Sequence, residues 1–484
     1  MMRVMAVRAS SLPLIIQGGM GVAISGWRLA NAVSSLGQLG LVAGTALDRV
    51  MMRRLQSGDL GGHIRRALDH FPFHDMAERL WSAYYVDGGL PDGVAYANPR
   101  MYDKAMARDL VEPCIVANFV EVWLAKDGHT NPVGINYLEK IQPPHLPSIY
   151  GAMLAGVDYV VMGAGIPMRI PGVLDAFVDH QTATYPLTVT GATEDDDTTM
   201  TFTPREYVEC DVPPLSRPMF LPVVASNVLA IAMVKKANGR VDGFVIEGPT
   251  AGGHNAPPRG KLQLNERGEP IYGDRDIVDL EKLRELGLPF WLAGGYGQPE
   301  QLREALAAGA AGIQVGTAFA YCVESGLRAD YKQTVLDQVA AGTARVFTDR
   351  LASPSGFPFK VVQLEGTVSD AATNQARPRV CDLGYLREAY RTPDGAIDFR
   401  CSGEPVNVFQ SKGGDIAETE GRKCVCNALI ATMGHPQTRA GGRLVEAGIV
   451  TSGDDLGQLT RFMPEGGTEY HAADVIRILL SGVE

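Results

Sequence analysis

The stretch Phe244 to Gly260, FVIEGPTAGGHNAPPRG, decides the fold of this chain. It begins with the apolar run Phe244 to Ile246, which is typical of a buried strand. A turn of small residues, Ala251 to Gly253, follows and ends on His254. Unpaired backbone N–H groups and an acid/base side chain therefore lie close together after the strand. This arrangement is typical of the strand C-termini of an α/β barrel. On this stretch alone, a glycine-rich loop with a structural histidine is an equal alternative.

Short apolar runs, most of them ended by glycine, recur through the first 320 residues and alternate with helical segments. Strands of this kind are typical of a parallel sheet that is buried on both faces. We count about eight alternations, so the sequence predicts a TIM (β/α)8 barrel, with an open doubly wound sheet as the alternative. Ten apolar runs are candidates for these strands, of which 220–225 is interpreted as the extension of a strand: 14–20, 39–44, 113–124, 131–138, 159–165, 185–191, 220–225, 244–246, 289–297 and 312–317.

The pattern also predicts how the chain is divided. The barrel is expected to span residues 10–360, with a helical and loop insertion at about 49–99. An excursion at about 194–217 carries an acidic run and is interpreted as a solvated hairpin. Residues 361–484 are richer in polar residues, Gly and Pro, and we expect a C-terminal extension that packs on the barrel.

Composition bounds the class of protein. Hydrophobic residues make up 45% of the chain and charged residues 20%, which are ordinary values for a globular protein. The net charge of -11 argues against a nucleic-acid partner, because binding to phosphates requires clustered Lys and Arg. The sequence has no apolar run long enough to span a bilayer, and residues 12–16 resemble a first strand and not a signal peptide. We therefore expect a cytoplasmic protein with no membrane partner.

Three strand ends carry adjacent small residues, namely Gly252-Gly253, Gly294-Gly295 and Gly316-Thr317. Glycines let backbone N–H groups approach a phosphate closely, and a helix that starts near Pro299 adds a favourable dipole. Barrel enzymes often bind a phosphate after strands seven and eight. The three ends together predict a phosphorylated ligand.

The cysteines form a separate candidate site. Their count of seven is odd, which argues against a disulfide framework. Four thiols gathered late in the chain suit zinc or an iron–sulfur cluster, but their spacing fits no standard metal pattern. Buried free cysteines are therefore the favoured interpretation, and no metal ligand is assigned. The four are Cys381, Cys401, Cys424 and Cys426.

Four motifs in this order carry a resemblance to a known family: Gln17 to Met20, Ala251 to His254, Ala293 to Gly295, and Gly312 to Phe319. They resemble the nitronate monooxygenase family, formerly called 2-nitropropane dioxygenases, over roughly residues 12 to 360. That family also contains the flavin-dependent enoyl-ACP reductases. The resemblance implies a TIM barrel that holds FMN at its C-terminal mouth.

The resemblance also implies roles for individual residues. The flavin ring would be lined by Gly18, Gly19 and Met20, and Asn118 in the expected strand 113–124 would also reach it. His254 would face the substrate, where an ordinary pKa of about 6.5 lets it accept or donate a proton near neutrality. The ribityl phosphate would be held by Gly252, Gly253, Gly294, Gly295, Gly316 and Thr317.

The resulting hypothesis is an FMN-dependent oxidoreductase that oxidises a nitronate, or a similar small carbon acid, with O2. One alternative is an NAD(P)H-dependent flavin reductase of an enoyl thioester, favoured by the form of the motif at Gln17 to Met20. A second alternative is a non-catalytic flavin-binding partner protein. The sequence leaves the oligomeric state open, with a homodimer among the states to be expected.

Overall fold

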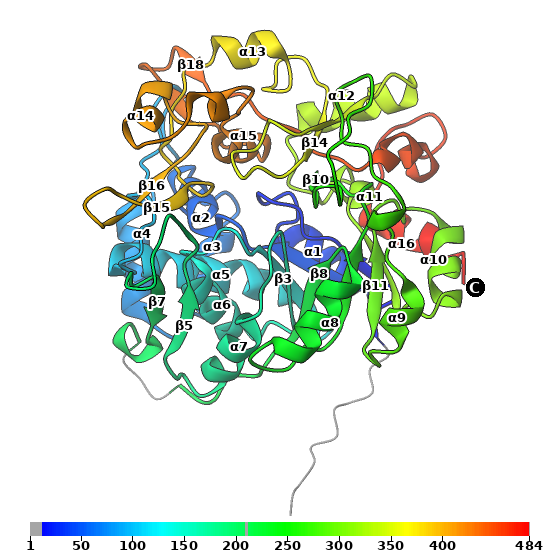
Figure 1. The fold of residues 1–484 in the computed structure, drawn as a ribbon, viewed down its shortest axis with the longest axis horizontal. Coiled ribbons are helices and arrows are strands. Elements are labelled where there is room, and N and C mark those ends of the chain that lie inside the picture. The colour runs from blue at the N-terminus through cyan, green and yellow to red at the C-terminus, as the bar shows by residue number, and fades with distance from the viewer. Residues whose placement is uncertain (1–11, 209–211, 484) are drawn as a thin grey trace, which may run out of the picture.

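The computed structural model describes residues 12–208 and 212–483 (Figure 1). Eight parallel strands form a closed barrel in which the last strand pairs with the first. The predicted TIM barrel is confirmed, and the open sheet is excluded. In chain order the strands are β1 (Ile15–Gln17), β2 (Leu39–Ala43), β3 (Val133–Leu138), β4 (Tyr159–Gly163), β8 (Met219–Val224), β9 (Phe244–Glu247), β11 (Phe290–Ala293) and β12 (Gly312–Val315).

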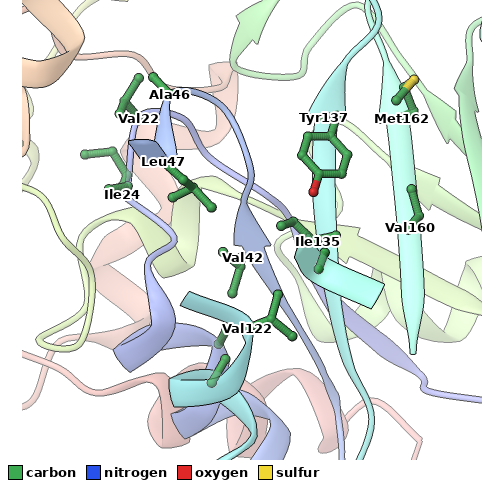
Figure 2. Close-up of a cluster of buried hydrophobic side chains, with 14 of the residues drawn as sticks. Val22, Ile24, Val42, Ala46, Leu47, Val122, Ile135, Tyr137, Val160 and Met162 are labelled. Atoms are coloured by element: carbon green, nitrogen blue, oxygen red, sulfur yellow. The ribbon is translucent and has the colours of Figure 1, made fainter. Parts of the chain in front are cut away.

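Alternate residues of the barrel strands belong to two separate apolar clusters. Leu41 of β2, Val161 of β4 and Trp291 of β11 pack with one another in the smaller cluster, inside the barrel. Their neighbours Val42 and Val160 belong to the larger cluster, which lies between the strands and the surrounding helices (Figure 2). The strands are thus buried on both faces, which explains why they read as continuous apolar runs.

The crossover helices surround the barrel (Figure 1). The longest, α5 (Arg108–Lys126), packs against α1 (Trp27–Ser35), α2 (Leu47–Gln56) and α6 (His145–Leu154) as well as against strands β2 and β3. No helix in the described ranges is both long and apolar enough to cross a membrane. The crossover helices are α1 (Trp27–Ser35), α5 (Arg108–Lys126), α6 (His145–Leu154), α7 (Ile170–Val178), α8 (Asn227–Lys236), α9 (Leu280–Arg284) and α10 (Pro299–Ala307).

The strand predicted over residues 113–124 is wrong, because these residues lie within helix α5. Nearly every residue from Leu110 to Ala125 is buried, since the helix is covered by the barrel on one side and by other helices around the rest. Such a helix has no polar face, so its sequence lacks the helical period and resembles a buried strand. Asn118 therefore lies on a helix and not at a strand end.

The strand predicted over residues 185–191 is not part of the barrel. Strand β5 (Ala183–Pro186) pairs antiparallel with β7 (Thr199–Phe202), so the expected hairpin exists but begins before residue 194. The acidic run lies on its exposed tip, where Asp196 pairs with Arg391 at 2.9 Å. Between β2 and α5 the predicted insertion holds helices α2 (Leu47–Gln56), α3 (His63–Leu68) and α4 (His74–Tyr84).

The chain after β12 adds a set of helices and supplies strands to three small sheets, two of which also contain a strand from earlier in the chain. β10 (Gly253–His254), β14 (Phe359–Val362) and β13 (Val346–Asp349) form one sheet, and β6 (Val189–Thr190), β15 (Glu388–Arg391) and β16 (Ile397–Arg400) form another. The third is β17 (Thr438–Arg439) with β18 (Leu444–Val445). The helices are α11 (Thr317–Ala320), α12 (Ala329–Ala340), α13 (Ala371–Ala376), α14 (Val406–Ser411), α15 (Val425–Thr432), the 3₁₀ helix η4 (Asp454–Phe462) and α16 (Ala472–Leu480).

This C-terminal segment contacts the barrel at several places. Helix α16 packs against α1 and α10 (Figure 1). The hydroxyl of Tyr385 donates to the buried carboxylate of Asp48 on α2, which also accepts a hydrogen bond of 2.9 Å from Tyr102. Strand β14 spans the predicted boundary between residues 360 and 361, and the division into two units stays a prediction.

Truncation of Trp291 to alanine should destabilise the barrel. Trp291 is fully buried, and its indole N–H donates to the Pro13 carbonyl at 2.8 Å. Loss of the ring leaves a cavity and an unpaired carbonyl, so the free energy of unfolding should fall by about 3–5 kcal/mol. Denaturant unfolding measures this, with Val228→Ala on the exposed face of α8 as the control. A loss below about 1 kcal/mol for Trp291→Ala would contradict the packing described here.

Candidate active site

A cavity of about 220 Å³ lies at the carboxyl ends of the barrel strands. The ends of β1, β3, β9, β11 and β12 line it together with residues 449–453 and Asp455 from the C-terminal segment. Parallel strands bring their carboxyl ends to one face of a barrel, where active sites of this fold are found. The strand ends that the sequence predicted to be functional therefore meet in one place.

The end of β1 closes one side of the cavity. The backbone N–H of Gly18 donates to the Val315 carbonyl of β12 at 2.8 Å, which places these two strand ends side by side. A Cβ on Gly19 would lie 1.8 Å from Oδ1 of Asn136, so only glycine fits this position. Gly18, Gly19 and Met20, which the sequence predicted to lie along a flavin ring, all line the cavity.

The segment after β9 brings His254 to the cavity. Gly252, Gly253 and His254 line it, and Gly253 has a positive φ of 77°. His254 does not end a free turn, because Gly253 and His254 form strand β10, which pairs with Lys360 and Phe359 of β14. The imidazole also lies against the Phe359 ring, with centroids 4.4 Å apart. The pairing therefore fixes the position of the histidine.

The ends of β11 and β12 form the side expected to receive a phosphate. Gly294, Gly295, Gly316 and Thr317 line the cavity there. Gly294 has a φ of 90°, and a Cβ on it would lie 2.9 Å from the Gly248 carbonyl oxygen, so glycine is required. The Thr317 hydroxyl accepts a hydrogen bond of 3.1 Å from the backbone N–H of Gly453.

The structure does not bring Asn118 to this cavity. Its side-chain amide donates to the Cys114 carbonyl at 2.8 Å, and its Oδ1 accepts from the Tyr137 hydroxyl at 2.9 Å. Asn118 instead lines a smaller pocket beside α5 and α6, whereas Tyr137 lines both pockets. The expected contact with a flavin depended on a strand that does not exist.

Two polar strand residues in the cavity were missed by sequence reasoning. Asn136 of β3 and Gln314 of β12 line it, and Asn136 Oδ1 and Gln314 Oε1 are buried without a hydrogen-bond partner among the described residues. Unpaired buried polar atoms are costly, so they indicate groups that await a ligand. The available signal was a polar residue within an otherwise apolar strand, VGINYL or GIQV.

Three titratable groups near the cavity have shifted pKa values. Burial, reinforced by the charge of Lys140, lowers the pKa of His254 well below its ordinary value. Burial raises the pKa of Glu247 to about 7, against the opposing charge of Lys140. Burial lowers the pKa of Lys140 to about 7, opposed by the charges of Glu139 and Glu247. Near neutral pH the imidazole is thus a neutral base, and the other two groups are poised to titrate.

The four late cysteines lie around one small pocket, Cys381, Cys401, Cys424 and Cys426. Each is a free thiol, and Cys401 is buried. Within residues 12–208 and 212–483, no group of three or more His, Cys, Asp or Glu side chains is arranged to hold a metal ion.

The fold and the cavity define an α/β barrel with a ligand site at the carboxyl ends of its strands. Residues 217–351 match the family model described as nitronate monooxygenase. The chain is 36% identical to the nitronate monooxygenase of Pseudomonas aeruginosa over 136 residues, which are 28% of this chain and 36% of the relative. It is 30% identical to the nitronate monooxygenase of Paraburkholderia phytofirmans over 180 residues, 36% of this chain and 45% of the relative. The matched part of the chain is thus similar to this family, in agreement with the resemblance drawn from the strand-end motifs.

The matches span less than half the length of these curated relatives. Among solved structures, the chain is similar to FabK from Thermotoga maritima, at 17% identity and a TM-score of 0.47, over 97% of this chain and 92% of that one. It is also similar to nitroalkane oxidase from Streptomyces ansochromogenes, at 14% identity and a TM-score of 0.47, over 97% and 95% of the two chains.

The His254 ring should stay neutral at pH 6. Burial and the neighbouring Lys140 lower its pKa, so protonation of the ring is expected only at lower pH. Nitrogen NMR of protein labelled with ¹⁵N-histidine measures the ring state, and the signal absent from His254→Gln assigns it. A doubly protonated His254 ring at pH 6 would show that the site is more solvated than its packing implies.

Proposed function

We propose that this protein is an FMN-dependent oxidoreductase that oxidises a nitronate, or a similar small carbon acid, with O2. The observation that carries the proposal is a single cavity that joins the glycine ends of β1, β11 and β12 to the imidazole of His254. A phosphate-binding edge and a neutral base thereby share one site. The family match over residues 217–351 supports the same conclusion.

The residues around the cavity fit FMN. Gly294, Gly295, Gly316 and Thr317 would hold the phosphate, because glycine backbones leave N–H groups open and Thr317 adds a hydroxyl. Gly252 and Gly253 lie on the adjoining wall and would complete that end of the site. The positions of Gly18, Gly19 and Met20 suit a flat ring, and the unpaired oxygens of Asn136 and Gln314 offer acceptors to its polar edge. When bound, FMN supplies the electron-accepting chemistry.

Asp455 adds a carboxyl group beside the phosphate end, near the Thr317 hydroxyl. A negative charge there would repel a phosphate. Burial raises the pKa of Asp455, which favours its neutral form. A neutral carboxyl can donate a hydrogen bond to a phosphate oxygen, so Asp455 would give the C-terminal segment a direct contact with the cofactor.

The chemistry assigned to the chain's own residues centres on His254. A neutral carbon acid must lose a proton before its carbon can give up electrons, and the unprotonated imidazole can accept that proton. A preformed nitronate needs no such step, and there the imidazole would only orient a nitronate oxygen. Apolar neighbours such as Phe359, Leu429 and Ile449 line the same cavity and would keep water from the reacting carbon.

The substitution His254→Gln should lower kcat/KM for a neutral nitroalkane by at least about 100-fold, because a general base contributes that much or more. Oxygen consumption with nitroethane or propyl-1-nitronate measures this in the FMN-loaded enzyme. The exposed His74 at the start of α4 supplies the matched control, His74→Gln. Full activity of His254→Gln with nitroethane would remove the role given to this residue.

The redox partner is tested anaerobically with the same holoenzyme. The proposal expects propyl-1-nitronate to bleach the flavin absorbance rapidly and NADPH to do so slowly or not at all. Rapid bleaching by NADPH alone would replace the proposal with the enoyl-thioester reductase. Absence of bleaching by either would favour a flavin-binding partner protein.

A further inference from the structure

Nε2 of His254 is the first member of a chain of hydrogen bonds. Nε2 of His254 lies 2.7 Å from the hydroxyl of Ser353, which is fully buried. That hydroxyl lies 2.8 Å from the hydroxyl of Ser355. Lys140 Nζ in turn lies 3.2 Å from the Ser355 hydroxyl. Four groups that can each carry a proton are therefore connected without a break.

The backbone around this chain fixes its members. Ser353 and Ser355 lie in the loop between β13 and β14, next to the strand that pairs with His254. The Arg422 guanidinium donates to the Ser353 carbonyl at 2.7 Å. Lys140 follows β3 at its carboxyl end, and its Nζ lies 3.9 Å from the centre of the Phe357 ring. The cavity is lined by His254 but by none of the other three.

The charges around Lys140 set its protonation near neutrality. Glu139 on the same loop and Glu247 at the end of β9 favour the ammonium form, and burial disfavours it more strongly. Its pKa is thereby lowered to about 7. The Lys140 charge also acts on His254, which burial and this charge keep neutral. Around neutral pH a substantial fraction of Lys140 is therefore an amine that can accept a proton.

We propose that Lys140 is the terminal proton acceptor of a relay that runs from His254 through Ser353 and Ser355. This inference rests on the proposed function, in which His254 receives a proton from a carbon acid. As Nδ1 of His254 takes the substrate proton, the proton on Nε2 passes to the Ser353 oxygen. The Ser353 proton passes to Ser355, and the Ser355 proton passes to the neutral Lys140 amine. The imidazole ends neutral, and the positive charge resides on Lys140.

The relay would remove the positive charge that His254 gains when it accepts the substrate proton. A buried imidazole with a lowered pKa is a weak base, and the positive charge it gains is poorly solvated. Transfer of that charge to Lys140 places it on a group whose ammonium form is favoured by the charges of Glu139 and Glu247. The relay should therefore matter for substrates that arrive protonated and not for those that arrive as anions.

The test compares nitroethane with preformed ethyl nitronate in the FMN-loaded enzyme. The measured quantity is the ratio of kcat/KM values for the two substrates as pH is varied from 5.5 to 8.5. In the wild type the ratio should rise with pH through about 7, as Lys140 becomes able to accept a proton. Lys140→Arg places a guanidinium there that stays charged throughout this pH range and cannot accept a proton, so the ratio should fall at least tenfold at pH 8 and lose its rise near pH 7.

Substitution of Ser353, in the middle of the relay, should lower the same ratio of kcat/KM values. Ser353→Ala should lower the ratio at least tenfold, and Ser353→Thr, which keeps the hydroxyl, should restore it to within about threefold of the wild type. Lys104→Arg, at a surface ion pair with Asp197, is the control for the lysine exchange. A ratio within threefold of the wild type in both Lys140→Arg and Ser353→Ala would overturn the relay.

A second readout separates failure of the relay from failure of the proposed function. If the wild type turns over neither substrate, the proposed function fails, and the relay is judged from the ring nitrogens of His254 alone. Their ¹⁵N shifts should show an inflection near pH 7 that reports Lys140 and is absent from Lys140→Arg. A wild-type protein with no such inflection would overturn the connection between the two residues.

Discussion

Closure of the parallel sheet between β1 and β12 is the constraint on which the rest of the molecule depends. The hydrogen bond from the Gly18 N–H to the Val315 carbonyl joins the first strand end to the last. Because all eight strands run in one direction, closure brings every carboxyl end to the same mouth. Glycines more than 290 residues apart in sequence, such as Gly18 and Gly316, then line one cavity.

The C-terminal segment completes this mouth. Strand β14 pairs with β10 and so holds His254 against Phe359. The loop before β14 supplies Ser353, whose hydroxyl lies 2.7 Å from Nε2 of His254, and Asp455 lines the cavity beside Thr317, where we propose that the phosphate binds. The segment therefore contributes side chains at both ends of the proposed site, and the chemistry of the barrel cannot be described from the barrel strands alone.

The sequence predicted those features that have a local signal. Short apolar strands ended by glycine were recognised because each carries its own turn residues, and the mouth of the barrel followed from their parallel order. The helix around Asn118 was mistaken for a strand, because burial on all sides removes the polar face that reveals a helix. The hydrogen bonds that connect Ser353 to Lys140 join residues 213 positions apart in the sequence. Only folding brings these residues together, so no local sequence signal could reveal the connection.

If the cavity is a flavin site whose phosphate end lies at β11 and β12, loss of the phosphate should weaken flavin binding. Equilibrium titration of the apoprotein with FMN and with riboflavin, followed by flavin fluorescence, measures this effect. The two ligands share the ring and differ in the phosphate, so FMN should bind at least about 100-fold more tightly, a difference of about 2.7 kcal/mol. Equal affinity for the two flavins, or no binding of either, would contradict this assignment of the cavity.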